Sequence, residues 1–155
     1  TPIKSSAASD VYKRQIKILV LSKLFFSVVT SFIISGGDDM GLNVGVYVKG
    51  NALILRLKGE LDDLSVTDLR TRVSRYIDDY KIKHLVINME KLEFMDSSGI
   101  GFIIGRFHQL KRVNGDVIIC NVHHKIERII NLSGLSKICM IRDNEESILL
   151  TIGGN

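Results

Sequence analysis

The sequence predicts a single α/β domain with a mixed, mostly parallel sheet of about four or five strands and about four helices. Two observations lead to this fold class. Two short β-rich runs flank a turn near residue 50, and strand-like segments then alternate with helix-like segments to the end of the chain. The length of 155 residues suits one domain with a sizeable core.

The regular part of the chain opens with the runs VGVYVKG (44–50) and ALILRLKGEL (52–61). Gly50 and Asn51 lie at their junction, which predicts an antiparallel hairpin. A helix is expected next, capped by Ser65 with Asp68 three positions on. Its apolar side chains recur at helical spacing, which predicts one core-facing side: Val66, Leu69, Val73, Tyr76, Ile77 and Tyr80.

The second half of the chain supplies the alternating strands and helices. Residues 84–89, HLVINM, are apolar without clean alternation, as expected for a strand covered on both faces. A helix from Ser98 to Leu110 follows and is predicted to stop at Asn114 and Gly115. The remaining expected elements are a strand at 116–122, a helix at 125–132, a short strand at 138–141 and a helix at 144–150.

Composition excludes several functional classes. The chain carries 21 Lys and Arg against 17 Asp and Glu, a net charge of +4 with no long block of either sign, so no nucleic-acid partner is expected. Cys120 and Cys139 lie inside apolar runs and are interpreted as small buried hydrophobic residues. The adjacent His123 and His124 have no partner at metal-ligand spacing. No metal and no cofactor are expected.

Residues 1–39 differ in character from the rest of the chain. The run from Ile16 to Ser35 is apolar over about the length of a membrane helix, although Lys23 interrupts it. Residues 36–40, GGDDM, can be back-translated as a purine-rich string resembling a bacterial ribosome-binding site followed by a start codon. We therefore expect residues 1–39 to be a non-native read-through leader and residues 40–155 to be the domain. An N-terminal membrane anchor is the alternative.

The stretch FMDSSGIGF (94–102) joins the strand at 84–89 to the helix that follows. Open α/β sheets place functional loops at this edge. Asp96, Ser97 or Ser98 can each cap the helix, and one cap suffices. A nucleophile elbow needs G-x-S-x-G, but Met95 occupies the position of the first glycine, so a serine hydrolase is not favoured.

The glycines of this stretch do not form a nucleotide-binding fingerprint. Gly99, Gly101 and Gly105 give G-x-G-x-x-x-G inside the helix rather than before it, and no Walker motif is present. Ser97, Gly101 and Gly105 recur every four residues and form one strip without large side chains. This strip either packs closely on the sheet or forms a flat surface for a partner, and the sequence leaves both open.

Three segments carry a resemblance to a known family: GELDD (59–63), LVINMEKLEFMDSSGIG (85–101) and LSGLSKI (132–138). They resemble the STAS-domain anti-sigma-factor antagonists, in particular the sporulation antagonists of bacilli and clostridia that act on the anti-sigma F factor. The resemblance covers residues 40–155 and implies the STAS fold. It also implies a regulator that is not an enzyme, has no catalytic residues and works in the bacterial cytoplasm.

The resemblance further implies a partner switch. The unphosphorylated antagonist binds an anti-sigma factor that is also a serine kinase, and so releases a sporulation sigma factor. Phosphorylation of Ser97 by that kinase switches it off, and a serine phosphatase reverses the modification. No membrane is involved, and the free protein is expected to be a monomer. The residues implied in partner binding are Glu60, Asp62, Asp96, Ser97, Ser98, Gly99, Gly101 and Gly105.

Two further functions remain open at this point. The domain could serve in a general stress-response partner switch or as a transport-associated STAS module. A small nucleotide-binding or hydrolytic α/β protein is the rival from a different class, and the missing glycine-loop and triad signals count against it. The GELDD turn is expected near the start of the DSSG helix, because both follow strands that reach the same sheet edge.

Overall fold

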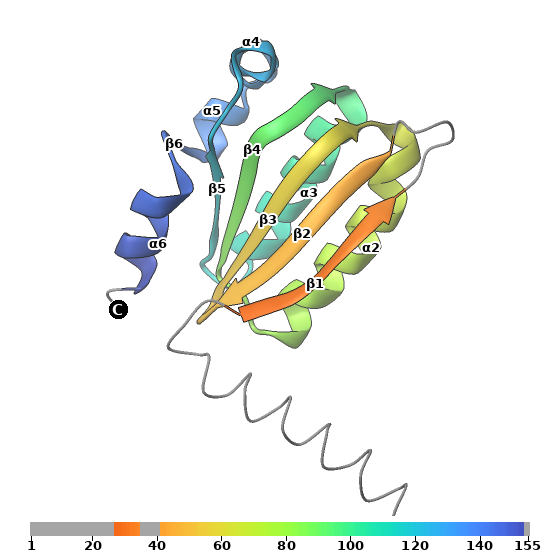
Figure 1. The fold of residues 1–155 in the computed structure, drawn as a ribbon. Coiled ribbons are helices and arrows are strands. Elements are labelled where there is room, and N and C mark those ends of the chain that lie inside the picture. The colour runs from red at the N-terminus through yellow and green to blue at the C-terminus, as the bar shows by residue number, and fades with distance from the viewer. Residues whose placement is uncertain (1–26, 35–40, 154–155) are drawn as a thin grey trace, which may run out of the picture.

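The computed structural model describes residues 27–34 and 41–153, and within them the backbone builds one six-stranded sheet in the order β1 to β6 (Figure 1). The first three strands are antiparallel neighbours, and β3 to β6 run parallel. The mixed, mostly parallel α/β sheet predicted from the sequence is confirmed. The strands are β1 (Ser27–Ile34), β2 (Leu42–Lys49), β3 (Ala52–Leu61), β4 (His84–Met95), β5 (Asp116–Cys120) and β6 (Met140–Arg142).

The helices cover the two faces of the sheet unequally. In Figure 1, α2 and α3 lie side by side behind the strands, while α6 lies at the opposite end of the sheet from β1. The short helix α5 was not anticipated from the sequence, and it raises the helix count of the described residues above the expected four. The helices are α2 (Asp63–Asp79), α3 (Ser97–Lys111), α4 (His124–Ser133), α5 (Leu135–Ile138) and α6 (Glu145–Gly153).

Two hydrophobic cores follow from this arrangement. The larger core lies between the sheet and helices α2 to α5, and it includes Leu69, Ile87 and Phe102, which are all fully buried. The smaller core lies on the other face, where Ile148 of α6 packs with Ile54 and its neighbours. Burial on both faces explains why residues 84–89 show no alternation of apolar and polar side chains.

The predicted hairpin is confirmed. Lys49 pairs with Ala52, so Gly50 and Asn51 form a two-residue turn. Gly50 has a φ of 60°, a conformation that primed hairpin turns require and that glycine adopts without steric cost. The hairpin fixes the register of β3, which in turn pairs with β4 and positions the end of that strand.

The predicted cap of α2 was wrong, and the helix begins earlier than expected. Asp62, not Ser65, is the N-cap: its Oδ1 accepts hydrogen bonds from the backbone N–H groups of Leu64 and Ser65, both at 3.1 Å. Ser65 is the reciprocal member of a capping box, because its Oγ accepts from the Asp62 N–H at 3.0 Å. An Asp at this position caps as well as a Ser, so composition alone did not identify the first turn.

Part of the expected leader forms a strand of the sheet. Residues 27–34 are β1, which pairs antiparallel with β2 from Ser27 opposite Val48 to Ile34 opposite Leu42. This strand was not anticipated from the sequence. Residues 1–26 and 35–39 of the expected leader lie outside the described residues, and the read-through origin of residues 1–39 stays a prediction. Over 27–34 and 41–153, no helix is long and apolar enough to span a membrane.

Candidate functional site

The candidate site lies where β4 ends and α3 begins. Asp96 has an extended backbone and is the N-cap of α3, with its Oδ1 accepting from the N–H of Ser98 at 2.9 Å and of Gly99 at 3.3 Å. Ser97 is the first helical residue. Of the three residues that could cap this helix, Asp96 is therefore the one that does, because its carboxylate accepts from those donors.

The two serines differ in exposure. Ser97 is exposed, whereas Ser98 is only partly exposed. Within the described part of the chain, no hydrogen bond engages the Ser97 hydroxyl, so it is not needed to hold the fold. The Ser97 hydroxyl is therefore accessible to a modifying enzyme, because it is exposed at a helix N-terminus and makes no hydrogen bond within the described residues.

The glycines of α3 have two different environments. A Cβ added at Gly99 would lie 2.5 Å from Cγ of Met95 and 3.0 Å from Cγ of Leu61, so this glycine is needed for close packing. A Cβ at Gly101 or Gly105 would meet nothing within 4 Å. Close packing on the sheet therefore explains Gly99 alone, and Gly101 and Gly105 leave the helix surface open.

The GELDD turn adjoins the start of α3, as predicted. Leu61 pairs with Met95 in the parallel β3–β4 ladder, and the Asp96 N–H donates to the Leu61 carbonyl at 3.2 Å. The N-cap residues of α2 and α3, Asp62 and Asp96, thus follow two strands that end at the same edge. We call this edge, formed by residues 60–64 and 93–105, the switch edge.

The switch edge is acidic although the whole chain has a net charge of +4. A phosphate added here would join an existing group of negative charges, which raises the cost of removing water from this edge. The acidic side chains at the ends of β3 and β4 and at the helix starts are Glu60, Asp62, Asp63, Glu93 and Asp96.

Two exposed apolar side chains at the switch edge were missed by the sequence analysis. Leu64 in the first turn of α2 is 63% exposed, and Phe94, near the end of β4, is 45% exposed. Exposed aromatic and aliphatic side chains beside polar groups are typical of partner contacts. The adjacency of Phe94 and Met95 carried a signal, since only one of two successive strand residues can face the core.

The remaining candidate residues have structural roles. Cys120 and Cys139 are buried, as predicted, and burial raises the pKa of their thiols to about 12 and about 11. His123 is the N-cap of α4: its Nδ1 accepts from the Lys125 N–H at 3.3 Å, and its ring lies 4.3 Å from that of His124. Neither histidine belongs to the switch edge.

Comparison with known proteins agrees with this architecture. Residues 43–148 match the STAS domain family. The anti-sigma F factor antagonist of Paenibacillus polymyxa is 36% identical over 110 residues, which cover 71% of this chain and 94% of the relative.

Solved structures give the same picture. The anti-sigma factor antagonist SpoIIAA in its unphosphorylated form matches with a TM-score of 0.61 at 28% identity, over 74% of this chain and 99% of that protein. The Bacillus cell fate determinant SpoIIAA in the phosphorylated form matches with a TM-score of 0.55 at 33% identity, over 69% of this chain and 96% of that protein.

A six-stranded mixed sheet that carries an exposed serine at the start of α3, together with the family match, defines the class: the chain belongs to the STAS domain family. Within that family, the relative from Paenibacillus polymyxa at 36% identity is an anti-sigma F factor antagonist.

Proposed function

We propose that this chain is an anti-sigma-factor antagonist whose unmodified form binds an anti-sigma factor and whose phosphorylation on Ser97 releases it. One observation carries the proposal: Ser97 is an exposed first residue of α3 whose hydroxyl makes no hydrogen bond within the described residues. A solved relative, SpoIIAA, exists in unphosphorylated and phosphorylated forms. The sigma factor set free is a sporulation factor, in line with the relative from Paenibacillus polymyxa.

The anti-sigma factor is also the kinase, and this chain is its substrate rather than an enzyme. A phosphoryl acceptor needs only an accessible hydroxyl, because a kinase supplies the base, the nucleotide and the metal ions. Exposure favours Ser97 over the partly exposed Ser98. A serine phosphatase removes the phosphate and returns the protein, a monomer when free, to its binding form.

The switch edge is the proposed partner surface. Gly101 and Gly105 let a partner approach the backbone of α3 closely, since no side chain projects from them. Leu64 and Phe94 supply exposed apolar area. The first turn of α3, with Asp96 and Ser98, and the acidic GELDD turn, with Glu60 and Asp62, complete the surface.

Phosphate opposes docking for an electrostatic reason. It adds about −1.5 to −2 charges beside the Asp96 carboxylate. In the free protein, water and the N-terminus of α3 stabilise that charge. In the complex it must lose water next to like charge, and a buried unpaired charge costs roughly 2–5 kcal/mol. That cost corresponds to about 30-fold to several-thousand-fold in affinity.

The proposal is tested by finding the partner and mapping the modification. The chain is used to capture its partner, and the captured protein is then incubated with ATP and the purified chain. We expect an anti-sigma factor that phosphorylates wild-type protein and Ser98→Ala, but not Ser97→Ala. Phosphate mapped to Ser98, or capture of a stress-response or transport protein in its place, would contradict the proposal.

A further inference from the structure

The path of β4 toward Ser97 contains two irregularities. The β3–β4 register runs without a shift from Ala52 opposite His84 to Arg56 opposite Asn88, then slips before Lys58 opposite Lys91 and again between Gly59 and Glu60. At each slip β4 contains one residue more than β3, which is the definition of a β-bulge. Both bulges lie between Asn88 and the cap of α3.

The bulges decide which β4 residues face the larger core. The buried core residues of this strand are Leu85, Ile87, Met89, Leu92 and Met95. Successive core-facing residues are two positions apart up to Met89 and three positions apart thereafter. Each extra residue therefore shifts the alternation of buried and outward-facing side chains by one position. The two shifts cancel at Met95, so loss of the first bulge alone would turn Leu92 and Met95 to the opposite face, and the Asp96 cap would turn with them. The bulges therefore set the orientation of Ser97.

The first bulge is held by one side chain. Asn88 is the last residue of β4 that pairs with β5, opposite Cys120, and it is only 8% exposed. Its Oδ1 accepts from the Glu90 N–H at 3.0 Å and so satisfies a backbone donor within the bulge. Its Nδ2 donates to Oε2 of Glu145 at 2.6 Å.

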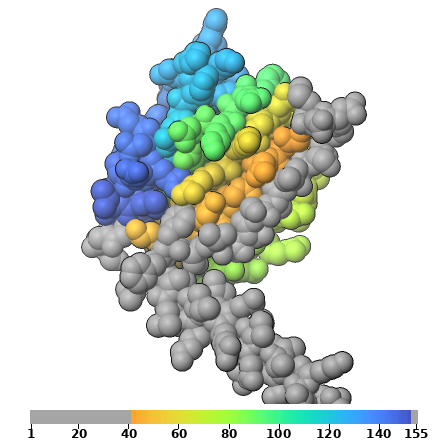
Figure 2. Space-filling model, in the orientation of Figure 1, coloured from red at the N-terminus to blue at the C-terminus, as the bar shows by residue number. Residues whose placement is uncertain are grey.

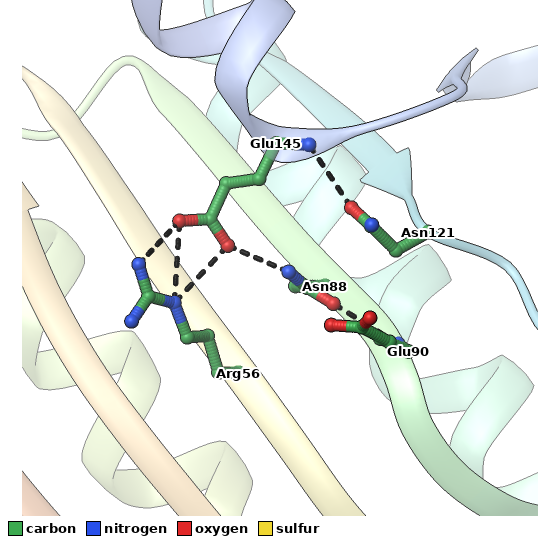
Figure 3. A network of polar contacts seen from close by, with 5 residues as sticks. All are labelled: Arg56, Asn88, Glu90, Asn121 and Glu145. Carbon is green, nitrogen blue, oxygen red and sulfur yellow. Dashed lines mark hydrogen bonds and ion pairs between the residues drawn. The ribbon is translucent and has the colours of Figure 1, made fainter.

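Glu145 connects this bulge to the start of α6 (Figure 3). Its carboxylate also accepts from Arg56, at 2.6 Å from Nη2 and 3.1 Å from Nε, and its backbone N–H donates to Oδ1 of Asn121 at 2.9 Å. Asn121 has a φ of 54°, a conformation rare for residues other than glycine. The group lines a polar hollow of about 700 Å³ on the sheet face beside α6, where Figure 2 shows β2, β3 and β4 at the surface.

We propose that Asn88 is a positioning residue for Ser97: through the Asn88–Glu145 hydrogen bond, α6 holds the first β4 bulge and thereby fixes how Ser97 is presented to the anti-sigma kinase. The predicted effect on phosphorylation rests on the proposed function, whereas the contacts of Asn88 do not depend on it. Asn88 lies in the regular part of the sheet and Ser97 beyond both bulges, so Asn88 acts only through the intervening backbone. Loosening α6 at Glu145 would therefore lower phosphorylation although no residue of the switch edge itself is substituted.

A polarity reversal tests the Asn88–Glu145 bond. Asn88→Asp keeps the acceptor for the Glu90 N–H but places a carboxylate oxygen against Glu145 Oε2. Adding Glu145→Gln restores the bond in the reverse direction, with the Gln amide donating and the original net charge recovered. Ile148→Val is the matched control, because it loosens α6 in the smaller core without touching the network.

The first measurement needs no partner. We expect the amide resonances of Ser97, Ser98 and Gly99 in NMR spectra to move in Asn88→Asp, to return in the double variant, and to stay in place in Ile148→Val. All variants are compared at a temperature at which each is folded by circular dichroism. Unmoved resonances in folded Asn88→Asp, or a double variant that stays shifted, would overturn the inference even if Ser97 is phosphorylated normally.

The second measurement is steady-state phosphorylation by the captured kinase. We expect Asn88→Asp to lower kcat by about 10- to 100-fold, as for other small misplacements of a reacting group, and the double variant to recover it. If kcat instead fell in proportion to melting temperature across the variants, so that Ile148→Val were equally impaired, Asn88 would have a merely structural role and the inference would be overturned. Failure of the wild-type chain to be phosphorylated would instead refute the proposed function, while the NMR result would still decide the role of Asn88.

Discussion

The backbone N–H of Asp96 donates to the carbonyl of Leu61 at 3.2 Å, and this bond joins the two segments that make up the switch edge. Leu61 directly precedes Asp62, the N-cap of α2, and Asp96 is the N-cap of α3. Two helices therefore begin side by side, each with an Asp at its start. A partner that contacts Ser97 can reach the GELDD turn at the same time.

The contribution of the GELDD turn to binding can be separated from its contribution to stability. Asp62→Ala removes the cap of α2 and is expected to cost about 1 kcal/mol, or roughly 3–6 °C in melting temperature. Asp62→Asn retains an acceptor oxygen, so together with Glu60→Gln it should leave the melting temperature nearly unchanged while weakening partner binding. Affinity is measured by calorimetry, and unchanged affinity of that double variant would remove the turn from the interface.

The glycines of α3 should respond in opposite directions to the same substitution. Gly101→Ala adds a methyl group that meets nothing and is expected to stabilise the fold by about 0.5–1 kcal/mol. Gly99→Ala forces a methyl group against Met95 and Leu61 and is expected to cost about 1–3 kcal/mol. Urea denaturation measures both.

Partner binding should follow a different order from stability. Gly101→Ala is expected to weaken the complex although it stabilises the free protein, because the methyl group intrudes where the partner approaches α3. A stabilised Gly101→Ala variant with wild-type affinity would place the partner elsewhere on the helix.

The buried thiols predict how stability changes at alkaline pH. Burial raises the pKa of Cys120 from 9.0 to about 12, so the unfolded chain loses this proton at a lower pH than the folded protein. The contribution of this thiol to the free energy of unfolding is fully present below pH 9 and decreases as the pH rises from 9 toward 12. At pH 10.5 the loss from this thiol is about 2 kcal/mol.

Denaturation of wild type and Cys120→Ala at pH 8 and pH 10.5 measures this effect. The substitution lowers stability at both values, and the fall between them should be smaller in the variant. Equal falls in the two proteins would show that the thiol does not contribute. Cys139, with a pKa of about 11, should give the same direction with a smaller change.

A fragment of residues 40–155 should fold cooperatively. Both described hydrophobic clusters are built around buried residues from Leu42 to Ile148, all of which the fragment retains. Loss of β1 exposes the backbone of one edge of β2, and association of the fragment through that edge is the main risk. A single sharp thermal transition of monomeric fragment is expected. A fragment that aggregates, beside a full chain recovered with membranes, would support an anchor instead.

The sequence predicted those parts of the fold that local signals determine. Gly50 and Asn51 mark a turn that only a hairpin explains, and the apolar run 84–89 identified the central strand. The start of α3 was located to within a residue, because a capping residue must stand near the DSSG segment. The exposed serine and the open glycines belong to that same segment, and their role in partner binding stays a prediction.

Features that depend on tertiary pairing were not predictable. The expected strand covered only the apolar run that ends at Met89, whereas β4 continues to Met95 through two bulges. The bond between Asn88 and Glu145 joins residues far apart in the sequence, and no spacing rule brings them together. The exposure of Leu64 was not predicted either, because the helix was expected to begin at Ser65 and Leu64 therefore lay outside it.

Ser97→Ala should separate the fold from the switch. Asp96 provides the cap and the Ser97 hydroxyl makes no hydrogen bond within the described residues, so stability should change by less than the roughly 1 kcal/mol that a cap contributes. The variant should bind the anti-sigma factor and remain bound in the presence of ATP. Release of Ser97→Ala on addition of ATP would mean that another residue carries the phosphate.

The most direct test of the account is the affinity of stoichiometrically phosphorylated protein for the anti-sigma factor, measured by calorimetry beside unmodified protein and Ser97→Ala. Phosphorylation on Ser97 is expected to weaken binding by about 30-fold or more, while Ser97→Ala is expected to bind as tightly as unmodified protein. Phosphorylated protein that binds as tightly as the unmodified form would contradict it.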